Sequence, residues 1–371
     1  MQPFERLVRQ GIRRTDLTGG STSHTRPSPR WALRLFAIVI TSALLTGCSE
    51  PGLDAAYRNY LERLGNTLDV DVEGIATTPG LRYPRTGKLQ LSLEGDALDT
   101  LEFLSLTGCA VQVTIGKRNS SLGRMAPPSQ RLLLDLEYLR LAPPCVESLR
   151  SRDKTDLADA LETAWQTKQA QLPRLIFNAT LGGVEFRALW RTASVPGDYP
   201  PVQSSAVIAA LDAINHHTER WLGGDYTADN TTFELLLSDI AGGDGGVVLQ
   251  ALARQRAWLT RANDLLAERR ARGPLCAPGI RHDAATVLPR VAQKFFVGEI
   301  QPHAAAMERR MYALLPPLRT LEAKLNGSLP PLYQQWQQAR DTLLADSRAA
   351  PARHVAALQE SLANCDNLPQ V

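Results

Sequence analysis

Apolar residues at helical spacing recur along most of the chain, and this period constrains the fold more than any other feature. The first stripe follows Pro51-Gly52 and consists of Leu53, Tyr57, Tyr60, Leu61, Leu64 and Leu68. Such a stripe predicts an amphipathic helix that packs one face on a core. The same period predicts helices over 130–140, 153–171, 205–222, 229–240, 247–270, 284–312, 332–343 and 350–363. The predicted fold class is therefore mainly α, with many helices.

Several short segments interrupt this period. The proline pairs Pro143-Pro144 and Pro316-Pro317 are expected to end helices, because proline lacks the amide hydrogen that a helix interior needs. The glycine-rich segment 242–246 predicts a flexible hinge or turn. Apolar residues alternate over 88–93 and 184–190, which predicts two short strands, or a short β-hairpin if they pair. The alternative is that tertiary contacts make either run helical.

The clearest break in the chain is 194–201, which holds three prolines and one glycine. A segment of this composition cannot be helical, so we interpret it as a linker. It separates a predicted N-terminal helical subdomain, 48–193, from a predicted C-terminal helical subdomain, 202–371. The segment 1–47 is excluded from the fold because its composition is that of an export signal.

The export signal has its parts in the expected order. Arg26, Arg30 and Arg34 precede an apolar run over 35–45, and the sequence Leu-Thr-Gly-Cys, a lipobox, ends at Cys48. The run is shorter than the ~20 apolar residues that span a bilayer. We expect cleavage after Gly47 and lipidation of Cys48. The alternative is a short inner-membrane anchor that happens to be followed by a cysteine.

A lipidated cysteine would decide how the protein is held. A bacterial lipoprotein carries a diacylglyceryl thioether and usually an N-acyl chain such as palmitate, and two or more chains form a durable anchor. In Gram-negative lipoproteins, Asp after this cysteine favours retention in the inner membrane, whereas here the residue is Ser49. We therefore expect the protein in the inner leaflet of the outer membrane, facing the periplasm.

The charge of the mature chain gives no reason to expect a nucleic-acid partner. The whole sequence has a formal net charge of +3, but residues 1–47 hold seven basic and two acidic residues. Removing them leaves 34 basic and 36 acidic residues, a net charge near −2. No basic stripe with interleaved aromatic residues is present, so nucleic acid is not an expected partner. Separately, we expect no cofactor.

Four cysteines follow the lipobox: Cys109, Cys145, Cys276 and Cys365. An even number in an oxidising compartment favours two disulfides, for which three pairings are possible. We favour Cys109–Cys145 with Cys276–Cys365, since each bond then closes a loop within its own half of the chain. The alternative is buried free thiols; metal binding is less favoured because no Cys-x-x-Cys spacing occurs.

The densest polar cluster of the chain lies at 116–124, between Gly116 and Arg124. Its candidate binding residues are Lys117, Arg118, Asn119, Ser120, Ser121 and Arg124. Cations, an amide and hydroxyls can together bind an anion or a sugar. The spacing fits neither a P-loop nor a nucleophile elbow, so we name no catalytic residue. The alternative is a structural loop whose side chains satisfy neighbouring helix ends.

Five stretches of the sequence are similar to those of a known protein family. They are Tyr-Pro-Arg at 83–85, Leu-Glu-Phe-Leu-Ser-Leu-Thr-Gly-Cys at 101–109, Ile-Gly-Lys-Arg-Asn-Ser-Ser-Leu-Gly-Arg at 115–124, Pro-Pro-Ser-Gln-Arg at 127–131 and Leu-Arg-Leu-Ala-Pro-Pro-Cys at 139–145. The chain resembles a family of Gram-negative lipoproteins known as domain of unknown function 3080. The resemblance implies an envelope lipoprotein and carries over no activity, cofactor or catalytic residue.

Three further motifs favour ordinary structural roles. Adjacent histidines at 216–217 diverge on a helix and cannot easily share one metal ion. The alternating acids over 69–73 lack the final Glu of a calcium loop. Tryptophans at 165, 221 and 336 fall in apolar stripes, which favours core packing over glycan stacking. We expect no metal site.

The leading functional hypothesis is a non-enzymatic outer-membrane lipoprotein that binds an envelope protein or glycan. The alternative is an envelope enzyme that acts on glycan or lipid, with 118–124 in its site. A third class is a passive scaffold.

Overall fold

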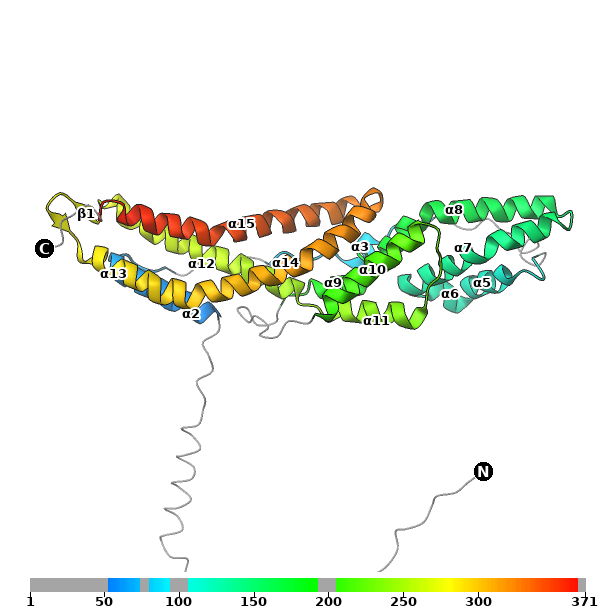
Figure 1. Cartoon of the computed structure of the whole chain (residues 1–371), viewed down its shortest axis with the longest axis horizontal. Helices are drawn as coiled ribbons and strands as arrows, with labels where there is room; N and C mark the ends of the chain where they lie inside the picture. The colour runs from blue at the N-terminus through cyan, green and yellow to red at the C-terminus, as the bar shows by residue number, and fades with distance from the viewer. Residues whose placement is uncertain (1–52, 74–79, 94–105, 193–204, 366–371) are drawn as a thin grey trace, which may run out of the picture. The chain divides into compact units, whose positions relative to one another are not determined.

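The protein folds as a bundle of helices in the computed structural model, which describes residues 53–73, 80–93, 106–192 and 205–365 (Figure 1). The prediction of a mainly α fold is confirmed. The helices are α2 (Leu53–Leu68), α3 (Thr86–Leu89), α5 (Ala110–Asn119), α6 (Ser121–Met125), α7 (Pro128–Arg150), α8 (Thr155–Ala179), α9 (Val184–Leu189), α10 (Ala206–Leu222), α11 (Asn230–Ala241), α12 (Gly245–Ala271), α13 (Asp283–Val291), the π-helix η1 (Ala292–Ile300), α14 (Gln301–Lys324), the 3₁₀-helix η2 (Asn326–Ser328) and α15 (Pro331–Leu362).

The predicted apolar stripes form the core. All six residues of the first stripe are buried in α2, which packs against α12, α13 and η1. The long helices α12 and α15 lie side by side (Figure 1), and α10 packs against both α11 and α14. A second, smaller cluster of buried apolar residues fills the space between α5, α7 and α8. This cluster includes Leu106, Ile115 and Leu149.

Proline does not end the helices where the sequence predicted. Helix α7 continues through Pro143-Pro144, α14 continues through Pro316-Pro317, and α15 continues through Pro351. The missing amide of Pro143 frees the carbonyl of Leu139, and Trp165 Nε1 donates to that carbonyl at 3.0 Å. A neighbouring helix thus supplies the hydrogen bond that proline removes, and the prediction of helix ends was wrong because it considered each helix alone.

The glycine-rich segment 242–246 forms the predicted turn between α11 and α12, and two of its glycines lie in tight packing. A Cβ on Gly243 would lie 2.4 Å from the side chain of Leu189, and one on Gly246 would lie 2.3 Å from the backbone of Trp190. Asp244, between them, accepts a hydrogen bond from Arg310 Nε at 2.9 Å. These glycines are needed for close packing.

The two predicted strands do not form, and the alternative of a helix holds for one of the two runs. Residues 184–189 form α9, and the run at 88–93 begins in α3 and continues without regular secondary structure. The amide of Asn178 occupies the place of a partner strand there: its Oδ1 accepts from Leu91 N at 2.8 Å and its Nδ2 donates to Leu91 O at 2.9 Å. Within the described residues, the one sheet pairs β1 (Cys276–Ala277) antiparallel with β2 (Ile280–Arg281).

Both predicted disulfides are confirmed. Cys109 bonds to Cys145, and Cys276 bonds to Cys365, across sequence separations of 36 and 89. In the chain-entropy model, the disulfide that closes the shorter loop stabilises the folded protein by about 4 kcal/mol, and the one that closes the longer loop by about 5 kcal/mol. The first bond holds the start of α5 to α7, and the second holds β1 to the chain just after α15.

Residues 51–371 form one compact unit. The predicted linker, 194–201, and the export signal, 1–47, lie outside the described residues, so the division into two subdomains stays a prediction. Helices from both sides of 194–201 pack together: α2 on α12, and α9 on α11.

One stretch, Asn230–Ala271, is long and apolar enough to cross a membrane by length and composition alone. The structure divides it into α11 and α12, which are separate helices. Val248, Leu252 and Leu259 of α12 are at most 1% exposed, so the apolar residues of this helix belong to the protein core.

A buried histidine joins three helices of the larger core. His354 Nε2 lies 2.6 Å from Tyr60 Oη, and its Nδ1 lies 2.7 Å from Asn263 Oδ1. Asn263 Oδ1 can only accept, so Nδ1 carries the hydrogen and Nε2 accepts from the tyrosine. Burial lowers the pKa of His354 to about 4, which keeps the imidazole neutral in the folded protein.

This histidine makes stability dependent on pH. The unfolded chain binds a proton at His354 near pH 6.5 and the folded chain near pH 4, so folding loses stability as pH falls through this window. From pH 7 to pH 5 the expected contribution is about 2 kcal/mol. Urea unfolding at the two pH values measures this loss. From pH 7 to pH 5, the free energy of unfolding should fall by about 2 kcal/mol less in His354→Gln than in wild type. The control His303→Gln, at an exposed histidine, should match wild type; equal pH dependence in all three proteins would contradict the assignment.

Candidate functional site at the α5–α6 segment

The predicted binding segment spans the end of α5 and the whole of α6. Ser120 lies between the two helices: its Oγ accepts from Gly123 N at 3.0 Å and donates to Lys117 O at 2.7 Å. This is an N-cap, which satisfies an amide that the start of α6 leaves unpaired. A Cβ on Gly123 would lie 2.1 Å from the carbonyl oxygen of Lys117, so the tight turn requires glycine.

Arg118 is engaged inside the protein. Its Nε lies 2.7 Å from Asp135 Oδ1, and its second nitrogen lies 3.2 Å from Oδ2. Lys168 Nζ donates to the same carboxylate at 2.9 Å and lies 5.0 Å from the ring centre of Tyr138. Asp135 is 1% exposed, so two cations neutralise one buried carboxylate and tie α5 to α7 and α8.

The other predicted residues lie at the surface. Lys117 makes a loose, exposed ion pair of 3.7 Å with Glu137. Asn119, Ser121 and Arg124 are exposed. Two apolar side chains of α6 share this surface, since Leu122 and Met125 are each 84% exposed. The structure thus gives Arg118 and Ser120 structural roles and leaves the remaining candidates on an exposed, partly apolar tip.

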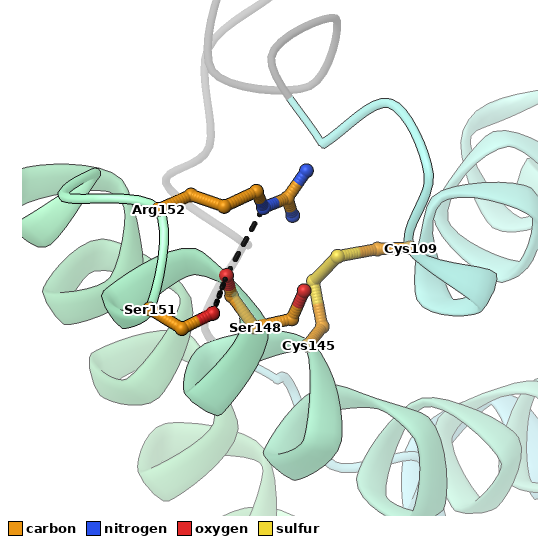
Figure 2. The surroundings of a disulfide bond; sticks show 5 residues. All are labelled: Cys109, Cys145, Ser148, Ser151 and Arg152. Atoms are coloured by element: carbon orange, nitrogen blue, oxygen red, sulfur yellow. Dashed lines mark hydrogen bonds between the residues drawn. A yellow bond between two sulfur atoms is a disulfide. The ribbon is translucent and has the colours of Figure 1, made fainter.

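The Cys109–Cys145 disulfide fixes the start of this segment to α7 (Figure 2). Just beyond it, the last turn of α7 is closed by two hydrogen bonds to the carbonyl of Ser148. Ser151 Oγ donates to that oxygen at 2.9 Å, and Arg152 Nε donates to it at 3.0 Å. Helix α5 is therefore held at two points, by the disulfide at its N-cap residue Cys109 and by the Arg118–Asp135 pair in its last turn.

Of the remaining sequence candidates, His217 and the tryptophans pack within the protein, whereas His216 and the acids at 69, 71 and 73 are exposed. His217 stacks on Trp221 with ring centres 5.5 Å apart, and burial lowers the pKa of this histidine. Trp221 is 1% exposed and Trp336 is 4% exposed, as predicted for core residues, while Trp165 is partly buried. In the described part of the chain, no three His, Cys, Asp or Glu residues come together in a group that could hold a metal ion.

The structure also reveals a cavity that the sequence did not indicate. We name it the arginine pocket, after Arg82, Arg187 and Arg191, which line a space of about 540 Å³ together with Tyr83, Val184, Ala188, Trp190 and Thr192. The residues at 82–83 and those at 184–192, which line the pocket together, lie about 100 residues apart in sequence. Two stretches singled out in the sequence contribute to its lining, the Tyr-Pro-Arg motif at 83–85 and the alternating run at 184–190, but neither pattern predicted a cavity.

Comparison with known proteins returns one family. The model described as "Protein of unknown function (DUF3080)" matches residues 57–369. No curated protein and no solved structure matches the chain.

The Arg118–Asp135–Lys168 cluster can be tested with two neutralisations on α7. Asp135→Asn removes the buried carboxylate with which both Arg118 and Lys168 pair, and should lower the free energy of unfolding by about 3–5 kcal/mol. Glu137→Gln, two residues away, removes only the exposed pair with Lys117 and should cost less than about 1 kcal/mol. Chemical denaturation measures both; similar costs for the two variants would contradict the structural role of Asp135.

Proposed function

The chain belongs to the DUF3080 family, and we propose that it is an outer-membrane lipoprotein, anchored through lipid on Cys48, whose helical body faces the periplasm. We propose that the body binds or supports another component of the envelope, either a protein or a glycan, and catalyses no reaction.

The observation that carries this proposal is the division of the cysteines. The sequence has five, of which four form the two disulfides. The fifth, Cys48, is the one that ends the Leu-Thr-Gly-Cys sequence after an apolar run. Structural disulfides form and persist in oxidising compartments such as the periplasm. Two independent features, the leader and the paired cysteines, therefore favour export.

The position of Cys48 also favours a body held near the membrane. Helix α2 begins at Leu53, and four residues separate it from Cys48. An extended chain covers at most about 3.6 Å per residue, so the start of α2 would lie within roughly 18 Å of the lipidated residue. A protein on so short a tether can act on partners at or close to the inner face of the outer membrane.

The alternative proposal is an envelope enzyme that uses 118–124 on glycan or lipid. It has less support, because Arg118 is committed to Asp135 and Ser120 to the cap of α6. The exposed tip, with Leu122 and Met125, fits a contact surface better than a catalytic site, which needs side chains that converge on one reacting atom.

The anchor is tested by Cys48→Ser. Wild-type protein should sediment with membranes and incorporate a palmitate analogue in labelling experiments. The variant should lose the label, and should either become soluble in the periplasm or remain unprocessed. If the variant is labelled and sediments as wild type does, the lipid anchor on Cys48 is wrong.

The choice of membrane is tested separately by the residue after the cysteine. Ser49→Asp should move the protein from the outer-membrane fraction to the inner-membrane fraction on a sucrose gradient, while its lipid label is retained. Ser49→Ala is the control and should stay with the outer membrane. Inner-membrane localisation of the wild type would contradict the outer-membrane assignment and leave the anchor itself standing.

A further inference from the structure

We propose that the arginine pocket is a binding site for a phosphate-bearing molecule. The proposal rests on the proposed function only for the compartment in which that molecule is found. Three observations carry it: the charges around the cavity, the rigidity of its aromatic wall, and an unpartnered donor in that wall.

The charge around the cavity is uncompensated. Three of its eight lining residues are arginines and none is acidic. Arg82, Arg187 and Arg191 are exposed, and within the described residues no side-chain hydrogen bond or ion pair engages their guanidinium groups. Elsewhere in the protein, arginines near the core are paired, as Arg118 is with Asp135 and Arg310 is with Asp244.

The nearest acid on α9 does not neutralise them. Glu185 is absent from the cavity lining. Its pKa is raised, first by burial and also by the charge of Glu234, whereas an arginine partner would lower it. A cluster of three like charges is unfavourable by itself, so a ligand that brings negative charge between the arginines gains their combined attraction.

The wall beneath the arginines is fixed before any ligand arrives. Tyr83 is buried, and its hydroxyl donates to the carbonyl of Leu181. Trp190 is 2% exposed and packs edge-on against Trp336 with ring centres 5.0 Å apart. The buried Arg340 lies 5.8 Å from the ring centre of Trp190. A wall that does not need to rearrange lowers the entropic cost of binding.

Trp190 also carries a hydrogen-bond donor that the protein leaves unused. Its indole Nε1 is buried and has no hydrogen-bond partner among the residues that the structure describes. A buried N–H without a partner destabilises the folded protein, so such groups call for an explanation. An oxyanion in the pocket would supply an acceptor beside the arginines.

The number of cations selects phosphate over carboxylate. A guanidinium group binds either oxyanion through two parallel hydrogen bonds. A single carboxylate offers one charge and two oxygens, whereas a phosphate monoester offers about −1.5 to −2 charges and three oxygens. Three arginines around a cavity of about 540 Å³ match the phosphate, and leave room for the group that bears it. That group is either a lipid or a soluble sugar, and the chemistry of recognition is the same.

Calorimetry on the full chain in a neutral detergent tests the site. The probes are inorganic phosphate and a short-chain phosphatidic acid, whose headgroup is a phosphate monoester, each titrated into wild type and into Arg82→Gln/Arg187→Gln/Arg191→Gln. The triple variant should bind the preferred probe at least about tenfold more weakly, since each charge-assisted hydrogen bond contributes to affinity. Its unfolding midpoint should stay near that of wild type, because all three arginines are exposed.

A matched control separates this site from general charge. Arg58→Gln/Arg174→Gln/Arg309→Gln removes three exposed arginines that lie outside the pocket, and it changes the net charge equally. It should bind both probes as wild type does. Tighter binding of the lipid probe supports a lipid headgroup as the source, and tighter binding of inorganic phosphate supports a soluble phosphorylated molecule.

Two results would overturn the proposal: no binding of either probe at millimolar concentration, or an equal loss of affinity in the control variant. Neither depends on the anchor, since both use purified protein. A Cys48→Ser variant that fractionates as wild type does would contradict the proposed function and leave the arginine pocket intact.

Discussion

The ion pair between Arg340 and Glu322 is the interaction on which the arrangement of the C-terminal helices depends. Arg340 on α15 is fully buried and Glu322 on α14 is 2% exposed, and two of their atom pairs lie at 2.6 and 3.0 Å. Removing two charges from water costs several kcal/mol, which only complete pairing offsets. Tyr333 and Gln337 supply that completion, each donating to a different oxygen of Glu322 at 2.7 Å. The pair therefore requires one register of α15 against α14.

This pair also connects the core to the arginine pocket. The guanidinium of Arg340 lies over the rings of Trp190 and Trp336, at 5.8 and 5.1 Å from their centres. Trp190 in turn touches Gly246 at the start of α12, where no side chain would fit. The end of α9, the start of α12 and the helices α14 and α15 thus belong to one connected group of contacts. A substitution that displaces Arg340 or Glu322 would also displace the Trp190 ring that lines the pocket. Close-packed interiors transmit such displacements because few voids absorb them.

The sequence predicted those features of the fold that depend on local pattern. The stripe in α2 has the helical period, and its six apolar residues are all buried. The features that it missed depend on contacts between distant residues. No local pattern announces that Trp165 will satisfy the carbonyl that Pro143 leaves open, or that the amide of Asn178 will pair with Leu91. Proline and alternation were interpreted correctly as local preferences, and tertiary contacts overrode both.

The same limit applies to the site. A dense run of polar residues at 117–124 looks identical in sequence whether it binds a ligand or holds a turn, and only the buried Asp135 reveals that Arg118 belongs to the fold. The arginine pocket has the opposite character, since Arg82 and Arg187 are ordinary surface residues until the chain brings them together. What separates the two clusters is pairing: a cation with a buried carboxylate stabilises the fold, and cations without one remain available to an anion from outside.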